Sequence, residues 1–163
     1  MSQVDTSLFK PELVFFDLEA TDEWDFFKQM QQRLQEMGYV KEGWYDAITT
    51  REKSFPTGLQ FEKIGIAIPH VDPESIIKPY IAVIKPKGTI DFAPMADMVD
   101  HPIHTELIIN LGLLAHAEDQ VAVLQVMMSI FMDENATDEI MSEDTPEGII
   151  ESIARRCREV PVA

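Results

Sequence analysis

The chain has little cysteine and few basic residues. Its 163 residues include one cysteine, Cys157, so no disulfide can form within the chain, which is typical of a reducing compartment. Lysine and arginine together number 13 against 29 acidic residues, giving a formal net charge of −16. Binding to nucleic-acid phosphates needs clustered lysine and arginine, so the charge argues against a nucleic-acid-binding protein. An acidic surface suits either a basic protein partner or simple solubility.

Long apolar runs are also missing. No run approaches the ~20 residues that a helix needs to cross a bilayer. The stretch from Met1 to Leu13 has no basic region followed by an apolar core, so we expect no signal peptide. The sequence shows no internal repeat, low-complexity segment or linker. We therefore expect a cytoplasmic protein whose residues 1–163 form one domain, without direct insertion into a membrane.

The stretch from Arg51 to His70, REKSFPTGLQFEKIGIAIPH, organises the rest of the chain. Ile64–Ile68 has β-branched residues at alternate positions, which predicts a strand. Proline has a fixed φ and no N–H to donate, so Pro69 ends this strand and His70 begins a loop. The turn-prone Pro56-Thr57-Gly58 allows the upstream residues to fold back beside the strand.

Several uncommon dipeptides recur here in order: Arg51-Glu52, then Pro-Thr-Gly, then Ala-Ile-Pro-His. Together they resemble the active-site segment of the fructose/mannitol-type (type 2) enzyme IIA proteins of the bacterial sugar phosphotransferase system. The Phe-Pro-Thr-Gly sequence and its spacing to Ile-Pro-His are most similar to the galactitol-specific branch. The resemblance extends more loosely from about Glu12 to Arg155. It implies that His70 is the phosphorylated residue and that the chain is an α/β protein.

The resemblance also implies a function. An enzyme IIA is a phosphotransferase component that accepts a phosphoryl group from the phosphocarrier protein HPr. It passes the group to a cysteine of the IIB component, which serves a membrane IIC permease importing sugar, here galactitol-like. No cofactor or metal is implied. Two alternatives remain: a regulatory nitrogen-type IIA that is phosphorylated at the same histidine but signals through protein binding, and a metal-dependent hydrolase using His70, His101 and His104.

The chemistry of the motif residues fits phosphoryl transfer. A histidine with an ordinary pKa near 6.5 is largely neutral at cytoplasmic pH, and the neutral ring has one nucleophilic nitrogen. The Arg51 guanidinium can hold two phosphoryl oxygens and stays protonated; the alternative is a surface ion pair with Glu52. The Thr57 hydroxyl can donate a hydrogen bond to phosphate, or Thr57 is only a turn residue. The partner that sets the tautomer of His70 cannot be named from the sequence.

Gln120 and His116 are two further candidates, carried only by the resemblance. In mannitol-type proteins a second histidine follows the strand that corresponds to Glu106–Leu111. Counting back from Leu124 places Gln120 at that position, where its amide can donate to phosphate. His116, a few residues earlier, is the alternative.

The pair His101 and His104 invites a zinc hypothesis. Zinc needs three or four convergent ligands. Pro102 breaks any helix that would bring both rings to one face, and no further ligand is recognisably spaced, so we expect no metal site.

The coarse pattern predicts the order β-α-α-β-β-β-α-α on a mixed sheet, a three-layer α/β/α sandwich that the resemblance also implies; the pattern alone leaves α+β open. We expect strands at 13–18, 64–68, 79–84 and 106–111, the last central, with an extended piece at 90–95. Helices are expected from a Thr21 cap to Gly38, over 41–53 with Arg51 in the last turn, from Glu118, briefly at 139–141, and from a Thr145 cap. The helix from Glu118 should bury Val121, Leu124, Met128 and Phe131.

Two further expectations concern burial. Cys157 has arginine neighbours that can lower a thiol pKa, but a cysteine in a terminal helix is more often inert filler. The density of apolar residues around the motif predicts a docking patch for protein partners, with packing against the sheet as the competing explanation. Its expected members are Phe55, Leu59, Phe61 and residues 90–95.

Overall fold

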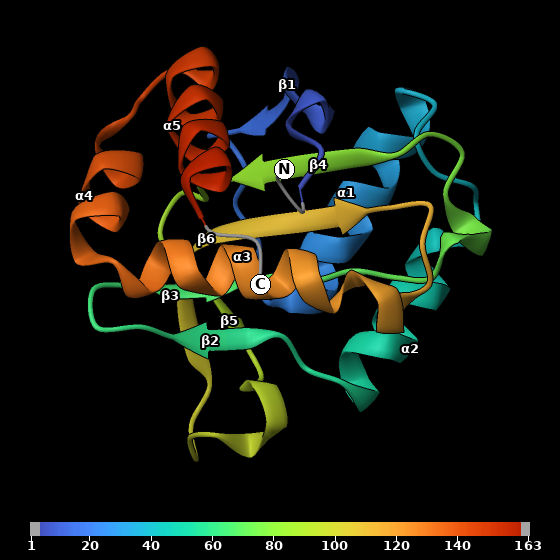
Figure 1. Ribbon diagram of the computed structural model, residues 1–163. Coiled ribbons are helices and arrows are strands. Elements are labelled where there is room, and N and C mark those ends of the chain that lie inside the picture. Colours follow the sequence, from blue (N-terminus) through green and yellow to red (C-terminus); the bar gives the residue numbers. More distant parts are fainter. Residues whose placement is uncertain (1–3, 161–163) are drawn as a thin grey trace.

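A mixed sheet of six strands lies between two layers of helices in the computed structural model, which describes residues 4–160 (Figure 1). The strands are β1 (Phe9–Phe15), β2 (Gly58–Gln60), β3 (Gly65–Ala67), β4 (Tyr80–Ile84), β5 (Ile90–Phe92) and β6 (Ile103–Gly112). The helices are α1 (Glu23–Glu36), α2 (Trp44–Ser54), α3 (Val121–Met132), α4 (Glu134–Ser142) and α5 (Pro146–Glu159). The predicted α/β/α sandwich is confirmed.

Strand β6 is the centre of the sheet. The strand order is β1-β4-β6-β3-β2, with β5 pairing with β6 as well. β6 runs parallel to β3 and antiparallel to β4 and β5. The predicted central strand at 106–111 is thus confirmed, although it is longer than expected. β2 pairs antiparallel with β3, so the motif folds back beside its own strand as expected.

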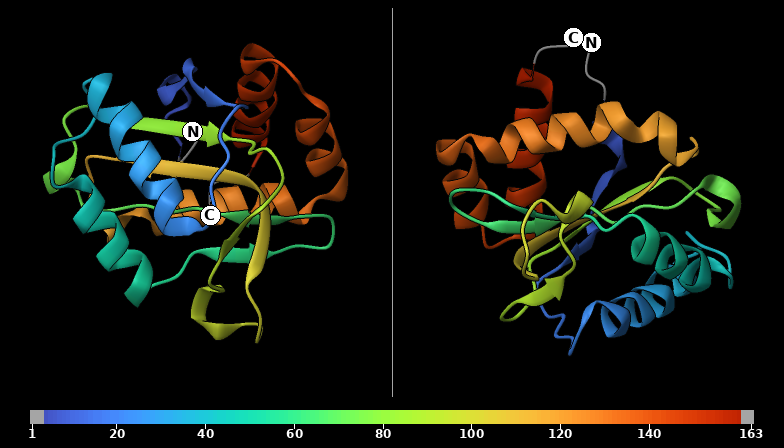
Figure 2. Two further views of the ribbon diagram at one scale, coloured as in Figure 1. Left: turned by 180° about the vertical axis from the view of Figure 1, so that it is seen from behind. Right: turned by 90° about the horizontal axis from the view of Figure 1, so that it is seen from below.

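Each face of the sheet has its own core. Helices α1 and α2 cover one face, and α3, α4 and α5 cover the other (Figure 2, right). On the first face, Phe27 of α1 packs edge-on against Phe92 with ring centroids 5.8 Å apart, and both are fully buried. On the second face, Met127 and Phe131 of α3 pack in the cluster that contains Ile66 and Ile109. The strands between the layers are buried on both sides, which is why they read as continuous apolar runs.

The first strand and first helix differ slightly from the prediction. β1 starts at Phe9 and ends at Phe15, earlier than the expected 13–18. It contains Pro11, which is tolerated because β1 lies at the edge of the sheet. The cap of α1 is Asp22, not Thr21: its side chain accepts from the N–H of Asp25 at 2.8 Å. Both residues are good capping types, and the sequence offers them side by side.

The C-terminal helices correct two expectations. Val121 of α3 is 49% exposed, and the buried residues are Val123, Val126, Met127, Ile130 and Phe131. α3 is apolar nearly all round, so its sequence does not define which face is buried. The short turn expected at 139–141 is the full helix α4, because the Asp133 side chain caps its start. The Thr145 cap of α5 is confirmed, with Gly148 N donating to Thr145 Oγ1 at 3.0 Å.

None of the helices in residues 4–160 is long and apolar enough to span a membrane. Residues 1–3 of the N-terminal stretch lie outside the described residues. Within that stretch, Thr6–Leu8 forms a short 3-10 turn that leads directly into β1.

Candidate functional site

The backbone at His70 is fixed to the central strand. His70 and Leu111 of β6 form a parallel bridge, and Leu111 N donates to the carbonyl oxygen of Pro69 at 3.0 Å. The same carbonyl accepts from Asn110 Nδ2 at 3.0 Å. Asn110 in turn accepts from the hydroxyl of Tyr80 at 2.9 Å, and both side chains are fully buried. His70 therefore sits at the end of a strand that two buried polar groups hold in register.

The tautomer of His70 is set by a main-chain group. Nδ1 of His70 lies 2.8 Å from the carbonyl oxygen of Ile68. A carbonyl can only accept, so Nδ1 carries the hydrogen and the lone pair is on Nε2. This is the partner that the sequence could not name, because every residue type has the same carbonyl. The ring presents one nucleophilic nitrogen, Nε2.

The surroundings keep the His70 ring neutral. Burial lowers the pKa of His70 below its ordinary value, and the Arg51 charge lowers that pKa further, while the Ile68 hydrogen bond and Asp72 act in the opposite direction. His70 is 5% exposed, so its ring is largely withdrawn from solvent. A neutral imidazole is the form that can attack phosphorus.

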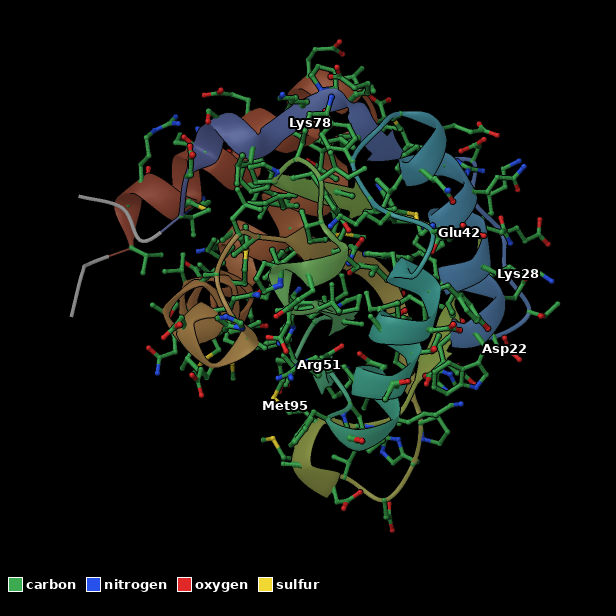
Figure 3. All side chains as sticks on the ribbon, turned by 90° about the vertical axis from the view of Figure 1, so that its right-hand side faces the viewer. Asp22, Lys28, Glu42, Arg51, Lys78 and Met95 are labelled. Carbon is green, nitrogen blue, oxygen red and sulfur yellow. The ribbon has the colours of Figure 1, made fainter. Side chains whose placement is uncertain are left out.

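His70 lines a cavity of about 310 Å³ together with Arg51 and Thr57. Arg51 comes from the last turn of α2, as predicted, and Met95 comes from the short 3-10 turn η3 (Met95–Asp97) after β5; Figure 3 shows both on one side of the molecule. The remaining lining residues are Ser54, Phe55, Pro56, Ala96, Asp97 and Leu124. Three of the predicted site residues are thus brought to one hollow.

Arg51 is half-buried and its charge is not neutralised by a close carboxylate. The salt bridges found within residues 4–160 do not include Arg51, so the alternative of an ion pair with Glu52 is not seen. Its Nε is buried without a hydrogen-bond partner, and its guanidinium carbon lies 5.0 Å from the ring centroid of Phe55. Burying an N–H donor without a partner is costly, so this group is set up for a ligand.

Thr57 and Glu52 form a buried pair that sequence reasoning missed. Oε1 of Glu52 accepts from Thr57 N at 2.8 Å and from Thr57 Oγ1 at 2.9 Å, and Oε2 lies 3.2 Å from the same hydroxyl. Burial raises the pKa of Glu52 to about 8, although the two Thr57 hydrogen bonds oppose the shift. The helical spacing was a usable signal: Glu52 lies four residues after Ile48, on the apolar side of α2.

A second buried carboxyl, that of Glu23, contacts the backbone between β5 and η3. Glu23 Oε2 accepts from Ala93 N at 3.1 Å, and the Ala93 carbonyl accepts from Gly58 N at 3.0 Å. Burial raises the pKa of Glu23 to about 7. Glu23 follows the Asp22 cap in a run of acidic residues, so no sequence signal separates it from its exposed neighbours.

Gln120 and His116 are not among the residues that line the cavity. Gln120 is fully buried, and its Nε2 donates to the carbonyls of Val71 and Ala115 at 3.2 and 2.9 Å. Both amide hydrogens are therefore donated to backbone carbonyls. Neither is left for the predicted hydrogen bond to a phosphoryl group. His116 is exposed, with Nδ1 3.7 Å from Asp72 Oδ1. A contact of either residue with a phosphoryl group stays a prediction, which their absence from the cavity lining does not favour.

The three histidines of the hydrolase alternative do not converge. His101 is exposed, and the exposed His104 pairs with Asp91 at 2.5 Å. Within residues 4–160, the side chains whose donor atoms come together as metal ligands would are Asp72, Glu74 and His116. The structure thus gives the hydrolase alternative no site.

The apolar residues around the motif divide into core and surface. Leu59 is 5% exposed, and Phe61 packs against Phe131 with ring centroids 6.4 Å apart. Ile90 and Phe92, from the stretch 90–95, are also core. Phe55 alone of the named aromatic residues is freely exposed, at 62%. Of the predicted docking patch, Phe55 and Met95 line the His70 cavity.

Solved structures of enzyme IIA proteins share this fold. The crystal structure of IIA mannitol from Escherichia coli superposes with a TM-score of 0.68 and 20% identity, covering 88% of this chain and 97% of that one. The nitrogen regulatory protein IIA-Ntr from Neisseria meningitidis gives 0.69 and 18%, covering 91% and 97%. An Escherichia coli complex of IIA mannitol with phosphorylated IIB mannitol also matches, at 0.69 and 19%, covering 90% and 96%.

The sequence assigns the chain to a family. The family model described as "Phosphoenolpyruvate-dependent sugar phosphotransferase system, EIIA 2" matches residues 7–156, so the chain belongs to this family and is a phosphotransferase-system component. The galactitol-specific EIIA component of Escherichia coli K12 is 29% identical over 90 residues. That match covers 55% of this chain and 58% of the relative, so the chain spans little more than half of it.

Proposed function

We propose that the chain is a phosphocarrier that takes a phosphoryl group onto Nε2 of His70 from phospho-HPr and passes it to a cysteine of a IIB component. The observation that carries this proposal is the His70 ring itself. Nδ1 is committed to the Ile68 carbonyl, which leaves Nε2 as the nucleophile, and His70 lines a cavity with Arg51. Membership of the EIIA 2 family supports a phosphotransfer role in general.

The transfer needs no proton exchange at His70. The Nε2 lone pair attacks phosphorus while the bond to the HPr histidine breaks, and that histidine leaves with the bonding electron pair. The His70 ring then carries a positive charge, which the Ile68 carbonyl stabilises through Nδ1–H. In the second step the IIB thiolate attacks phosphorus and His70 leaves neutral. Arg51 stabilises the equatorial phosphoryl oxygens in both steps, which is the main work of a protein in this chemistry.

A galactitol-like sugar is the proposed cargo of the pathway, on the strength of the 29% identical relative. We place the chain in the cytoplasm, with HPr, the IIB component and the membrane IIC component as its pathway partners. The IIA mannitol structure in complex with its phosphorylated IIB supports a IIB partner for this fold. The fold likeness to IIA-Ntr is as good, so the regulatory role is the second candidate.

The phosphoacceptor is tested by labelling. Enzyme I, HPr and labelled phosphoenolpyruvate should give an acid-labile, base-stable phosphoprotein, as expected for phosphohistidine. H70A should remove the label, and H116A is the matched control that should keep it. Label that persists in H70A and disappears in H116A would contradict the assignment.

Transport and regulation are separated by the acceptor. Phosphorylated protein mixed with a galactitol-type IIB should lose its phosphate to the IIB cysteine. The two proteins should bind weakly, at roughly micromolar Kd or looser, because a carrier must exchange partners. No transfer to IIB, together with tight binding to a kinase or a transcription factor, would favour the regulatory role.

A further inference from the structure

Thr57 connects Glu52 to the His70 cavity. Thr57 lines the cavity together with His70 and Arg51, and its hydroxyl also contacts both carboxyl oxygens of Glu52. A hydroxyl has a single hydrogen to donate. The protonation state of Glu52 therefore decides where that hydrogen points.

The two states of Glu52 have opposite consequences. As a carboxylate, Glu52 can only accept, so it takes the Thr57 hydroxyl hydrogen as well as the Thr57 N–H. As a neutral acid, it still accepts the N–H on Oε1 at 2.8 Å, while the proton on Oε2 is donated to Thr57 Oγ1 across 3.2 Å. The hydroxyl hydrogen of Thr57 is then free to turn into the cavity.

We propose that Glu52 is a positioning residue. Its neutral acid form donates a hydrogen bond to Thr57 Oγ1, so that the Thr57 hydroxyl can donate its own hydrogen to the phosphoryl group on His70. This role rests on the proposed function of His70 as the phosphoacceptor. It assigns a task to the glutamate of the Arg-Glu pair.

The charges around Glu52 favour the neutral acid. Glu52 is 2% exposed, and burial disfavours its carboxylate. The charged groups that act on it are Glu23 of α1, which also disfavours the carboxylate, and Arg51 of its own helix, which favours it; the net effect is a raised pKa of about 8. A phosphoryl group on His70 brings more negative charge into the same cavity, which favours the acid further.

The test is the pH dependence of phosphoryl uptake from phospho-HPr, measured for the wild-type chain and for E52Q, T57V and T57S. A glutamine at position 52 accepts from Thr57 N and donates to Thr57 Oγ1 at every pH, so it mimics the neutral acid. Dividing each variant rate by the wild-type rate at the same pH removes the effects of pH on the phosphoryl donor, phospho-HPr. E62Q, which alters an exposed carboxyl on the same hairpin, is the control and should give a ratio near one throughout.

We expect the E52Q ratio to stay near one below the Glu52 pKa and to rise above it, levelling off near the factor that T57V loses, about tenfold. T57V should be slower than wild type by about tenfold or more at low pH, because a hydrogen bond to a charged group is lost. T57S should restore the wild-type profile. Thermal unfolding of each variant establishes that it is folded, and T57V tests the role even where E52Q does not fold.

The outcomes separate this role from the proposed function. An E52Q ratio that is flat through pH 9, or a T57V rate equal to wild type, would overturn the role of Glu52 and leave His70 as the acceptor. A wild-type chain that takes up no label, or an H70A chain that still does, would overturn the proposed function and this role with it.

Discussion

Asn110 of the central strand donates from Nδ2 to the carbonyl oxygen of Pro69, the residue that precedes His70, at 3.0 Å. The contact joins residues 41 positions apart in the chain. Tyr80 of β4 completes it by donating to Asn110 Oδ1. The strand end that carries His70 is therefore held to two neighbouring strands by buried polar groups.

The first prediction concerns this tie. N110A should lower the free energy of unfolding by about 2–3 kcal/mol, because it leaves the Tyr80 hydroxyl buried without its acceptor and empties a small volume. Y80F, which removes only the hydroxyl, should cost about 1 kcal/mol. Urea unfolding followed by circular dichroism measures both. Equal, negligible effects would mean that Leu111 and the strand ladder alone hold the site.

Arg51 should matter for transfer and little for folding. R51A removes the charge that faces the phosphoryl oxygens, and the uptake rate should fall by about 10²–10³-fold. Because Arg51 is half-buried and pairs with no carboxylate within residues 4–160, the free energy of unfolding should change by less than about 1 kcal/mol. R155A, which breaks an exposed pair with Glu139, is the charge-matched control and should transfer at the normal rate. A normal uptake rate in R51A would show that Arg51 takes no part in phosphoryl transfer.

The buried carboxyls predict how stability depends on pH. Burial raises the pKa of Glu52 to about 8 and that of Glu23 to about 7, from an ordinary value near 4.5. The folded state therefore keeps protons that the unfolded state releases above pH 4.5. Their contribution to stability is complete below pH 4.5 and is lost as the pH rises through 7 and 8.

The E52Q variant lacks one of these two titrating carboxyls, so it measures the contribution of Glu52 alone. Between about pH 5 and 8 the wild-type free energy of unfolding should fall more steeply than that of E52Q, by up to about 1.4 kcal/mol per pH unit. Chemical denaturation at several pH values gives both slopes. Identical slopes would show that Glu52 titrates normally in the folded protein.

Two glycines should respond oppositely to alanine. A Cβ at Gly112 would overlap the ring of Tyr80, so G112A should be destabilised by about 1–3 kcal/mol. A Cβ at Gly43 meets nothing within 4 Å, and Gly43 has a φ of −79°, so G43A should be neutral or slightly stabilised. Thermal unfolding midpoints measured side by side test the pair. Destabilisation of both to the same extent would contradict the packing at Gly112.

Cys157 should be unreactive while the protein is folded. The side chain is 1% exposed in α5, and burial raises the pKa of its thiol to about 12, against a small opposite effect of Arg158. A thiol reagent at pH 8 should therefore label it only after denaturant is added, with the free cysteine in a short peptide as the reference. Rapid labelling of the folded protein would show that α5 opens locally.

The sequence predicted the fold best where the strands are buried. Residues 64–68, 79–84 and 106–111 read as apolar runs because helices cover both faces of the sheet. It predicted α3 less well, since a helix that is apolar nearly all round gives no face, and Val121 was wrongly placed in the core. The Thr21 cap failed for a local reason, because Asp22 beside it caps equally well.

The site was predicted in part for similar reasons. His70, Arg51 and Thr57 lie in one short stretch, so their meeting follows from a single hairpin and a helix end. Gln120 and His116 come from a distant segment, and counting along the sequence could not show that neither of them lines the cavity. Glu52 was missed because a glutamate beside an arginine is normally read as its ion-pair partner.

The hydrogen bond from His70 Nδ1 to the Ile68 carbonyl has a consequence for how this site tolerates change. The acceptor is present whatever amino acid occupies position 68, so no substitution there removes it. A saturation scan of position 68 should report only on how well each side chain fills the core. Substitution can remove the attacking nitrogen but cannot switch it from Nε2 to Nδ1 while the strand end is intact. The choice of nitrogen therefore depends on the backbone at the end of the strand and not on the side chain at position 68.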